Sequence, residues 1–165
     1  MHNPAIVISM SVQRTMLLIW ALAFFALALS AILYQHTHPL DTQSINASRT
    51  VVQVGGETVM TEVADTPALQ TRGLSGRASL AEGEGILFVF EEEGEHSIWM
   101  KDMHFAIDII WAAGDGTIVT IKEGATPESY PEVFHSAAPA RYVLEVNAGF
   151  VKHAGVAVGG KIVVQ

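Results

Sequence analysis

Short β-rich runs separated by turns are the feature that most constrains this chain's fold. Between Thr50 and Val164, valine, isoleucine, threonine and aromatic residues gather in short segments that glycine or proline interrupts. Such runs indicate strands, and long helical segments that would link parallel strands are missing. We therefore predict an α+β domain, compact and β-rich, with seven or eight short, mainly antiparallel strands that would close into a barrel-like sheet. The expected strands are 50–54, 57–63, 85–90, 96–100, 107–112, 117–121, 142–146 and 161–164.

Two short helices complete the predicted domain. Thr66 is suited to cap a helix that starts at Pro67, and Gly73 is suited to end it. A second helix is expected over 150–154. Gly55-Gly56 should form the turn of the first hairpin, and Glu91-Glu92-Glu93-Gly94-Glu95 a solvated turn. Residues 122–141 read as a long loop, either covering a binding site or packed on itself as an Ω-loop.

An uncharged segment, residues 15–35, precedes this domain. Its core from Met16 to Leu33 is apolar except for Ser30, and roughly 20 helical residues span a ~30 Å hydrocarbon core. Arg14 precedes it, which favours a cytoplasmic amino terminus over 1–14 and an extracytoplasmic (periplasmic) domain. The segment is expected to be an uncleaved single-pass anchor in the inner membrane. A signal that is cleaved near Ser30 to release the domain into the periplasm is the alternative. Residues 36–49 read as a linker, and the domain should cover 50–165.

The charge balance and the absence of cysteine exclude several kinds of function. The chain has nine basic and seventeen acidic residues, and only Arg14 of these precedes the apolar segment. An acidic domain lacks the basic face that nucleic-acid binding requires. The absence of cysteine excludes disulfides, thiolate metal sites and a cysteine nucleophile. We predict no cofactor, no metal and no nucleic-acid partner; membrane contact is expected only through residues 15–35.

The segment from Ser97 to Asp108 is the best site candidate. It sets Trp99, Met100, Lys101 and Asp102 between two apolar runs, and Asp108 lies inside the second run. Unpaired buried charges are costly, so these groups must be paired or reach the surface. Asp108 is expected to pair with Lys101 or with an arginine. Arg72 and Arg77 would either bind an anion or tie the end of the first helix to an acidic neighbour.

Several segments in the same order resemble a widespread prokaryotic family, domain of unknown function 192. The resemblance covers roughly Val51 to Val164. It rests on Val63-Ala64-Asp65-Thr66-Pro67, Arg72-Gly73-Leu74 with Arg77, Gly85-Ile86-Leu87-Phe88, Trp99-Met100-Lys101 with Asp108, and Val143-Leu144-Glu145-Val146-Asn147-Ala148-Gly149. It implies a compact β-rich domain, frequently preceded by an export signal or anchor, and it implies no agreed reaction.

The chain departs from this family pattern at four places. Asp102 stands where the family usually has asparagine, Ala106 where it has proline, Ser75 where it has methionine, and Gly160 where it has aspartate. Asp102 adds a charge beside Lys101 and removes two N–H donors.

Three functions stay open from the sequence. The first is a non-catalytic binding or accessory module, in which Trp99 and Met100 offer an apolar surface and Lys101 and the two arginines bind a polar end. The second is a hydrolase-like enzyme that would use Asp102, His104, Asp108 and Glu145 as acids and bases. Against it, no catalytic motif of known mechanism occurs. The third is a purely structural polar cluster.

Overall fold

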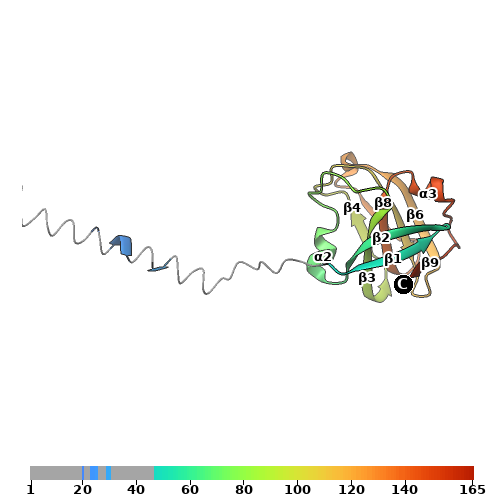
Figure 1. Ribbon diagram of the computed structural model, residues 1–165, viewed down its shortest axis with the longest axis horizontal. Helices are drawn as coiled ribbons and strands as arrows, with labels where there is room; N and C mark the ends of the chain where they lie inside the picture. The colour runs from blue at the N-terminus through green and yellow to red at the C-terminus, as the bar shows by residue number, and fades with distance from the viewer. Residues whose placement is uncertain (1–19, 21–22, 26–28, 31–46) are drawn as a thin grey trace, which may run out of the picture. The chain divides into compact units, whose positions relative to one another are not determined.

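The computed structural model describes residues 20, 23–25, 29–30 and 47–165. The predicted cytoplasmic segment 1–14, and most of the predicted anchor and linker (15–35 and 36–49), lie outside these residues. Among the residues described, there is no helix that combines the length and the apolar character needed to cross a membrane. Residues 47–165 lie within one compact unit of short strands and short helices (Figure 1).

Seven strands form one curled sheet in the order β6-β5-β8-β3-β2-β1-β9, and β4 pairs with β7 in a separate two-stranded sheet. The strands are β1 (Arg49–Val54), β2 (Glu57–Ala64), β3 (Glu84–Gly94), β4 (Ser97–Trp99), β5 (Ile107–Ala112), β6 (Ile118–Ala125), β7 (Val133–His135), β8 (Ala140–Asn147) and β9 (Ile162–Val164). Every strand pair is antiparallel except β2 with β3. The prediction of a mainly antiparallel, β-rich domain is confirmed.

The two edges of the large sheet approach each other at one end, which gives a half-barrel. Thr117 bridges to Lys161, and the Ile118 amide donates to the Gly160 carbonyl at 2.8 Å. The Ile162 amide donates to the carbonyl of Gly116 at 2.9 Å. Gly116 has φ +82°, and a side chain there would collide with the Ile162 carbonyl, so this closure depends on glycine.

The helices also follow the sequence signals. Helix α2 (Pro67–Arg72) has Thr66 as its N-cap, whose hydroxyl accepts from the Leu69 amide at 3.3 Å. Gly73 ends the helix, and its amide donates to the Leu69 carbonyl at 2.8 Å. Helix α3 spans Phe150–Ala154, and a short 3-10 turn, η1, spans Pro127–Ser129.

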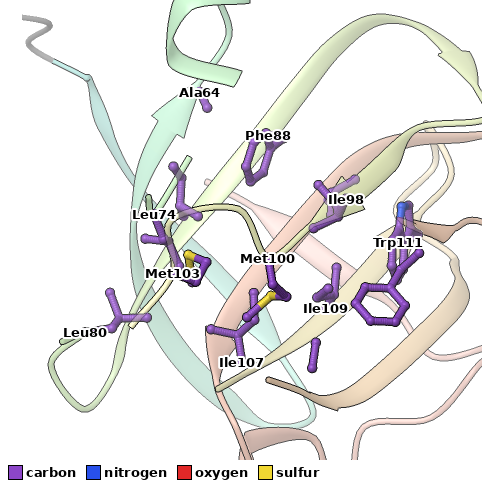
Figure 2. Packing of buried hydrophobic residues seen from close by; sticks show 14 of the residues in the cluster. Ala64, Leu74, Leu80, Phe88, Ile98, Met100, Met103, Ile107, Ile109 and Trp111 are labelled. Carbon is purple, nitrogen blue, oxygen red and sulfur yellow. The ribbon is translucent and has the colours of Figure 1, made fainter. Parts of the chain in front are cut away.

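Both faces of the sheet are buried at β5, which explains why this strand is apolar throughout except for Asp108. Ile107, Ile109 and Trp111 belong to one hydrophobic cluster, and Ile110 and Ala112 belong to the other. Figure 2 shows the first cluster, where Met100 and Met103 join residues of β5. Side chains of a strand alternate between faces, so a strand covered on both sides loses the alternation of polar and apolar residues.

Two predicted loops are wrong. Glu91 to Gly94, predicted as a turn, continues β3, because Gly94 pairs with Ala140 and the Glu93 carboxylate accepts from the Gly114 amide. Residues 122–141, predicted as a loop, contain the end of β6, η1, β7 and the start of β8. In both segments the pairing comes from residues remote in sequence, which outweighs local composition.

Candidate functional site

Asp108 is fully buried, and backbone amides surround its carboxylate. It accepts hydrogen bonds from Gly124 at 2.8 Å, Gly149 at 3.0 Å and Val151 at 2.9 Å. The predicted pairing with Lys101 or an arginine is therefore wrong. Gly149 is the N-cap of α3, where amides lack helical partners, so Asp108 supplies the capping acceptor from another strand. This carboxylate joins β5, β6 and α3.

Glu145 is the second buried carboxyl group, and it lies on the opposite face of the sheet from Asp108. Its cross-strand partners are Ile86 and Ile109, whereas Asp108 pairs with Val146. Loss of hydration in this apolar surrounding raises the pKa of Glu145 to about 8. Asp108 and Glu145, two of the four residues considered as acids and bases in the hydrolase alternative, are thus separated by the sheet.

Arg77 is engaged within the fold. Its guanidinium donates to both carboxylate oxygens of Glu62, at 2.8 and 2.6 Å. These bonds hold the pKa of Glu62 below its usual range. The interpretation of Arg77 as a tie to an acidic neighbour is confirmed. The side chain of Arg72, in contrast, is exposed and makes no hydrogen bond or ion pair within 4 Å among residues 47–165, although its charge helps to lower the pKa of Glu62.

Asp102 lies in a tight turn with φ +56°, the left-handed region, where asparagine and aspartate are tolerated better than most residues. Its carbonyl accepts from the Gly76 amide at 2.8 Å, and the Lys101 carbonyl accepts from the Ser75 hydroxyl at 2.8 Å. The backbone conformation therefore explains why aspartate replaces the usual asparagine, since both residues suit this position.

We expect Asp102→Val to lower the free energy of unfolding by about 1–2 kcal/mol, because a β-branched residue is strained at positive φ. Asp102→Asn should leave it nearly unchanged. Urea unfolding of the two variants checks this. Equal losses in both variants would mean that the carboxylate, rather than the backbone conformation, matters here.

Two of the predicted site residues that the fold leaves exposed line one small hollow. It has a volume of about 50 Å³ and lies between the end of α2 and β4. Arg72 and Trp99 are among its lining residues. Three larger hollows, of about 190, 330 and 270 Å³, are lined by none of the predicted site residues.

Trp99 is unusually exposed for so large an apolar side chain, with 47% of its surface accessible to solvent. Tyr130, itself 45% exposed, packs edge-on against it with ring centres 6.1 Å apart. The Lys101 ammonium lies 5.6 Å from the centre of the Trp99 ring. We call Arg72, Trp99, Lys101 and Tyr130 the Trp99 surface.

The remaining predicted site residues do not join this surface. Met100 is 1% exposed and belongs to the core, so its predicted place on an apolar surface beside Trp99 is wrong. His104 is exposed, whereas Asp108 and Glu145 are buried. Within residues 47–165, no three histidine, aspartate or glutamate side chains are placed to hold a metal.

Sequence reasoning missed two residues. Tyr130 was hidden in the segment predicted as a loop. Asn147 lay in the Val143–Gly149 segment, and its side-chain amide donates to the carbonyls of Leu80 and Ala81 at 3.0 and 3.2 Å. It fastens the connection that leads from α2 to β3.

A family model matches residues 33–164, most of the chain. The chain belongs to the DUF192 family. That family is described only as an uncharacterized ACR, so membership assigns no function. A search of curated proteins finds no match.

Two solved structures are similar. One is a Sinorhizobium meliloti 1021 protein described as a proposed transcription regulator. It is 35% identical, covers 73% of this chain and 96% of its own, and has a TM-score of 0.68. The other, of unknown function, is from Novosphingobium aromaticivorans DSM 12444. It is 31% identical, covers 70% of this chain and 82% of its own, and has a TM-score of 0.63.

The segments that resemble DUF192 divide into two groups. Arg77, Asp108 and Asn147 are engaged in contacts that hold connections to the sheet. Arg72 and Trp99 make no such contact and line the hollow. The second group is therefore the candidate functional site.

Proposed function

We propose that this DUF192 domain is a non-catalytic module that binds a segment of a partner protein at the Trp99 surface. One observation carries the proposal. Among the predicted site residues, the exposed side chains of Arg72 and Trp99 line one hollow, and the Lys101 ammonium lies over the Trp99 ring. A half-exposed tryptophan beside a tyrosine and an unpaired arginine has the composition of protein-interface hot spots.

The size of the hollow favours a protein segment over a small ligand. Pockets that enclose small molecules have volumes of roughly 300–1,000 Å³. The hollow beside Trp99 has about 50 Å³, enough for part of one side chain. A peptide would place one apolar side chain there and spread over the exposed rings.

The separation of Asp108 and Glu145 argues against the hydrolase alternative. Paired carboxyl groups in catalysis must approach the same bond of a substrate. Here the carboxylate of Asp108 is held by backbone amides, and Glu145 lies within a hydrophobic cluster on the opposite face. Neither group lines the hollow beside Trp99.

Trp99→Ala tests the binding site. We expect peptides enriched from a displayed random heptapeptide library against the full-length chain to bind this variant about tenfold more weakly, because a central aromatic anchor is lost. Binding affinity is measured by surface plasmon resonance. Unfolding in urea should change by less than about 1 kcal/mol, since the ring is half exposed.

Val158→Ala is the matched control, because Val158 is also an exposed apolar side chain, at 61%. It should bind the selected peptides as the unaltered chain does. A folded Trp99→Ala protein with undiminished binding, or a selection that enriches no peptide, would contradict the proposed function.

The uncharged segment 15–35 supports a location for this module at the extracytoplasmic face of the inner membrane. There a membrane-held domain would meet a partner at high local concentration. The Sinorhizobium protein is described as a proposed transcription regulator, and the acidic balance of this chain argues against nucleic-acid binding here. Protease added outside spheroplasts should cleave the domain; protection until lysis would contradict this location.

A further inference from the structure

We infer that the partner segment binds as an added β-strand along the free edge of β4, and that this segment is extended and acidic. The inference rests on the proposed function and specifies its binding mode. It follows from the position of the hollow, the backbone of β4 and the charges beside it.

The hollow runs along one edge of β4. Within residues 47–165, β4 pairs only with β7, whose three residues do not line the hollow. All three residues of β4 do line it. Neighbouring side chains of a strand point to opposite faces, so a small hollow that is lined by three consecutive residues lies at the strand's edge and not on one face. Residues 70–75, at the end of α2, also line the hollow.

This edge offers backbone groups to a new strand. In an antiparallel pair, alternate residues direct their N–H and C=O groups away from the partner strand. Among residues 47–165, the backbone of Ser97–Trp99 makes no hydrogen bond outside its pairing with β7. The strand also contains no proline and no charge, the usual protections of an exposed edge. Such an edge is suited to strand addition.

The side chains of β4 complete this platform. Ile98 is buried in the hydrophobic cluster, so the strand is fixed in place. Trp99 points away from the cluster and stays half exposed. A side chain of an incoming strand would lie directly beside the Trp99 ring, as cross-strand neighbours do.

The charges next to this edge select an acidic segment. Arg72 is the one charged residue among those that line the hollow, and Lys101 lies over the Trp99 ring. No aspartate or glutamate lines the hollow, although the chain as a whole carries seventeen. The Arg72 side chain makes no hydrogen bond or close ion pair among residues 47–165, so its guanidinium can bind a carboxylate bidentately.

Backbone methylation distinguishes strand addition from other binding modes. Peptides that bind full-length chain in a Trp99-dependent manner are synthesised with single N-methyl groups at successive positions. We expect losses of about tenfold at alternate positions and little change between them, because only every second amide of an added strand faces β4. If N-methylation changes the affinity of Trp99-dependent peptides at no position, strand addition is overturned. The proposed function would remain supported by that result.

A charge exchange tests the acidic character of the segment. The Arg72→Glu variant should bind acidic peptides about tenfold more weakly than the unaltered chain. It should bind more tightly the versions of these peptides in which lysine replaces the acidic residue. Arg141→Glu is the control: Arg141 is exposed and contacts the Tyr142 ring, away from the hollow. Selected peptides without acidic residues, or equal effects of both variants, would overturn this part. If the unaltered chain forms dimers and the Trp99→Ala variant is monomeric, the edge of β4 binds a second copy of the chain. That result would also overturn the inference of an acidic partner segment.

Discussion

Replacing Asp108 with alanine is expected to lower the free energy of unfolding by on the order of 4 kcal/mol. The change leaves buried amides of Gly124, Gly149 and Val151 without an acceptor. Hydrogen bonds to a charged group contribute about 1.5–3 kcal/mol each, and unsatisfied buried donors add a desolvation cost. Asp108→Asn keeps an acceptor oxygen and should lose about half as much.

Urea unfolding followed by tryptophan fluorescence measures this effect. Asp65→Ala is the matched control, because Asp65 is exposed and makes no hydrogen bond within residues 47–165; its change should stay within about 0.5 kcal/mol. If Asp108→Ala fails to fold, Asp108→Asn still gives a measurable difference. A stable Asp108→Asn protein that has lost peptide binding would instead place Asp108 in the functional site.

Glu145→Gln is expected to stabilise the domain in mildly alkaline solution while changing little in acid. The pKa of Glu145 is about 8 in the folded chain, against a usual value of 4.5, because burial disfavours its charged form. Folded chains therefore retain a proton that unfolded chains release. The contribution of Glu145 to the stability of the unaltered protein is fully present below pH 4.5. It decreases between pH 4.5 and about 8, and it is lost above that.

Glutamine resembles the protonated carboxyl group in shape and does not ionise. The variant should therefore exceed the unaltered chain by roughly 3–5 kcal/mol near pH 9, since each pH unit between the two pKa values contributes about 1.4 kcal/mol. Unfolding free energies measured between about pH 5 and pH 9 test this. Glu92→Gln, at an exposed position of β3, is the control and should leave the profile unchanged. Parallel profiles for the unaltered chain and Glu145→Gln would refute the burial argument.

Most of the fold could be predicted from the sequence because turns, helix caps and buried strands depend on residues that are close together in the chain. The Gly55-Gly56 hairpin, the Thr66 cap and the buried run of β5 depend on neighbours in sequence. β7 escaped prediction because it has only three residues in a proline-rich segment. The parallel pairing of β2 with β3 depends on how the connection between them crosses the sheet, which composition does not encode.

The sequence located the candidate site better than it assigned roles within it. Arg72, Trp99 and Lys101 were recognised from their residue types and lie together. The role of Asp108 was misread because its partners are amides at positions 124, 149 and 151, and any residue can supply an amide. Tyr130 carried no signal at all, since only the folded chain brings it to Trp99.

The pairing of β1 with β9 has a consequence for how the chain folds. The hydroxyl of Thr50 reaches the carbonyl of Gln165 across 115 positions of sequence. Closing so long a loop costs conformational entropy before the contacts between its ends can form and stabilise the sheet. Sheets built from such remote pairs fold in milliseconds to seconds. A ribosome must therefore synthesise the final residues before this sheet can be completed. Until then one edge of β1 stays exposed, and a chaperone can bind the partly synthesised chain there.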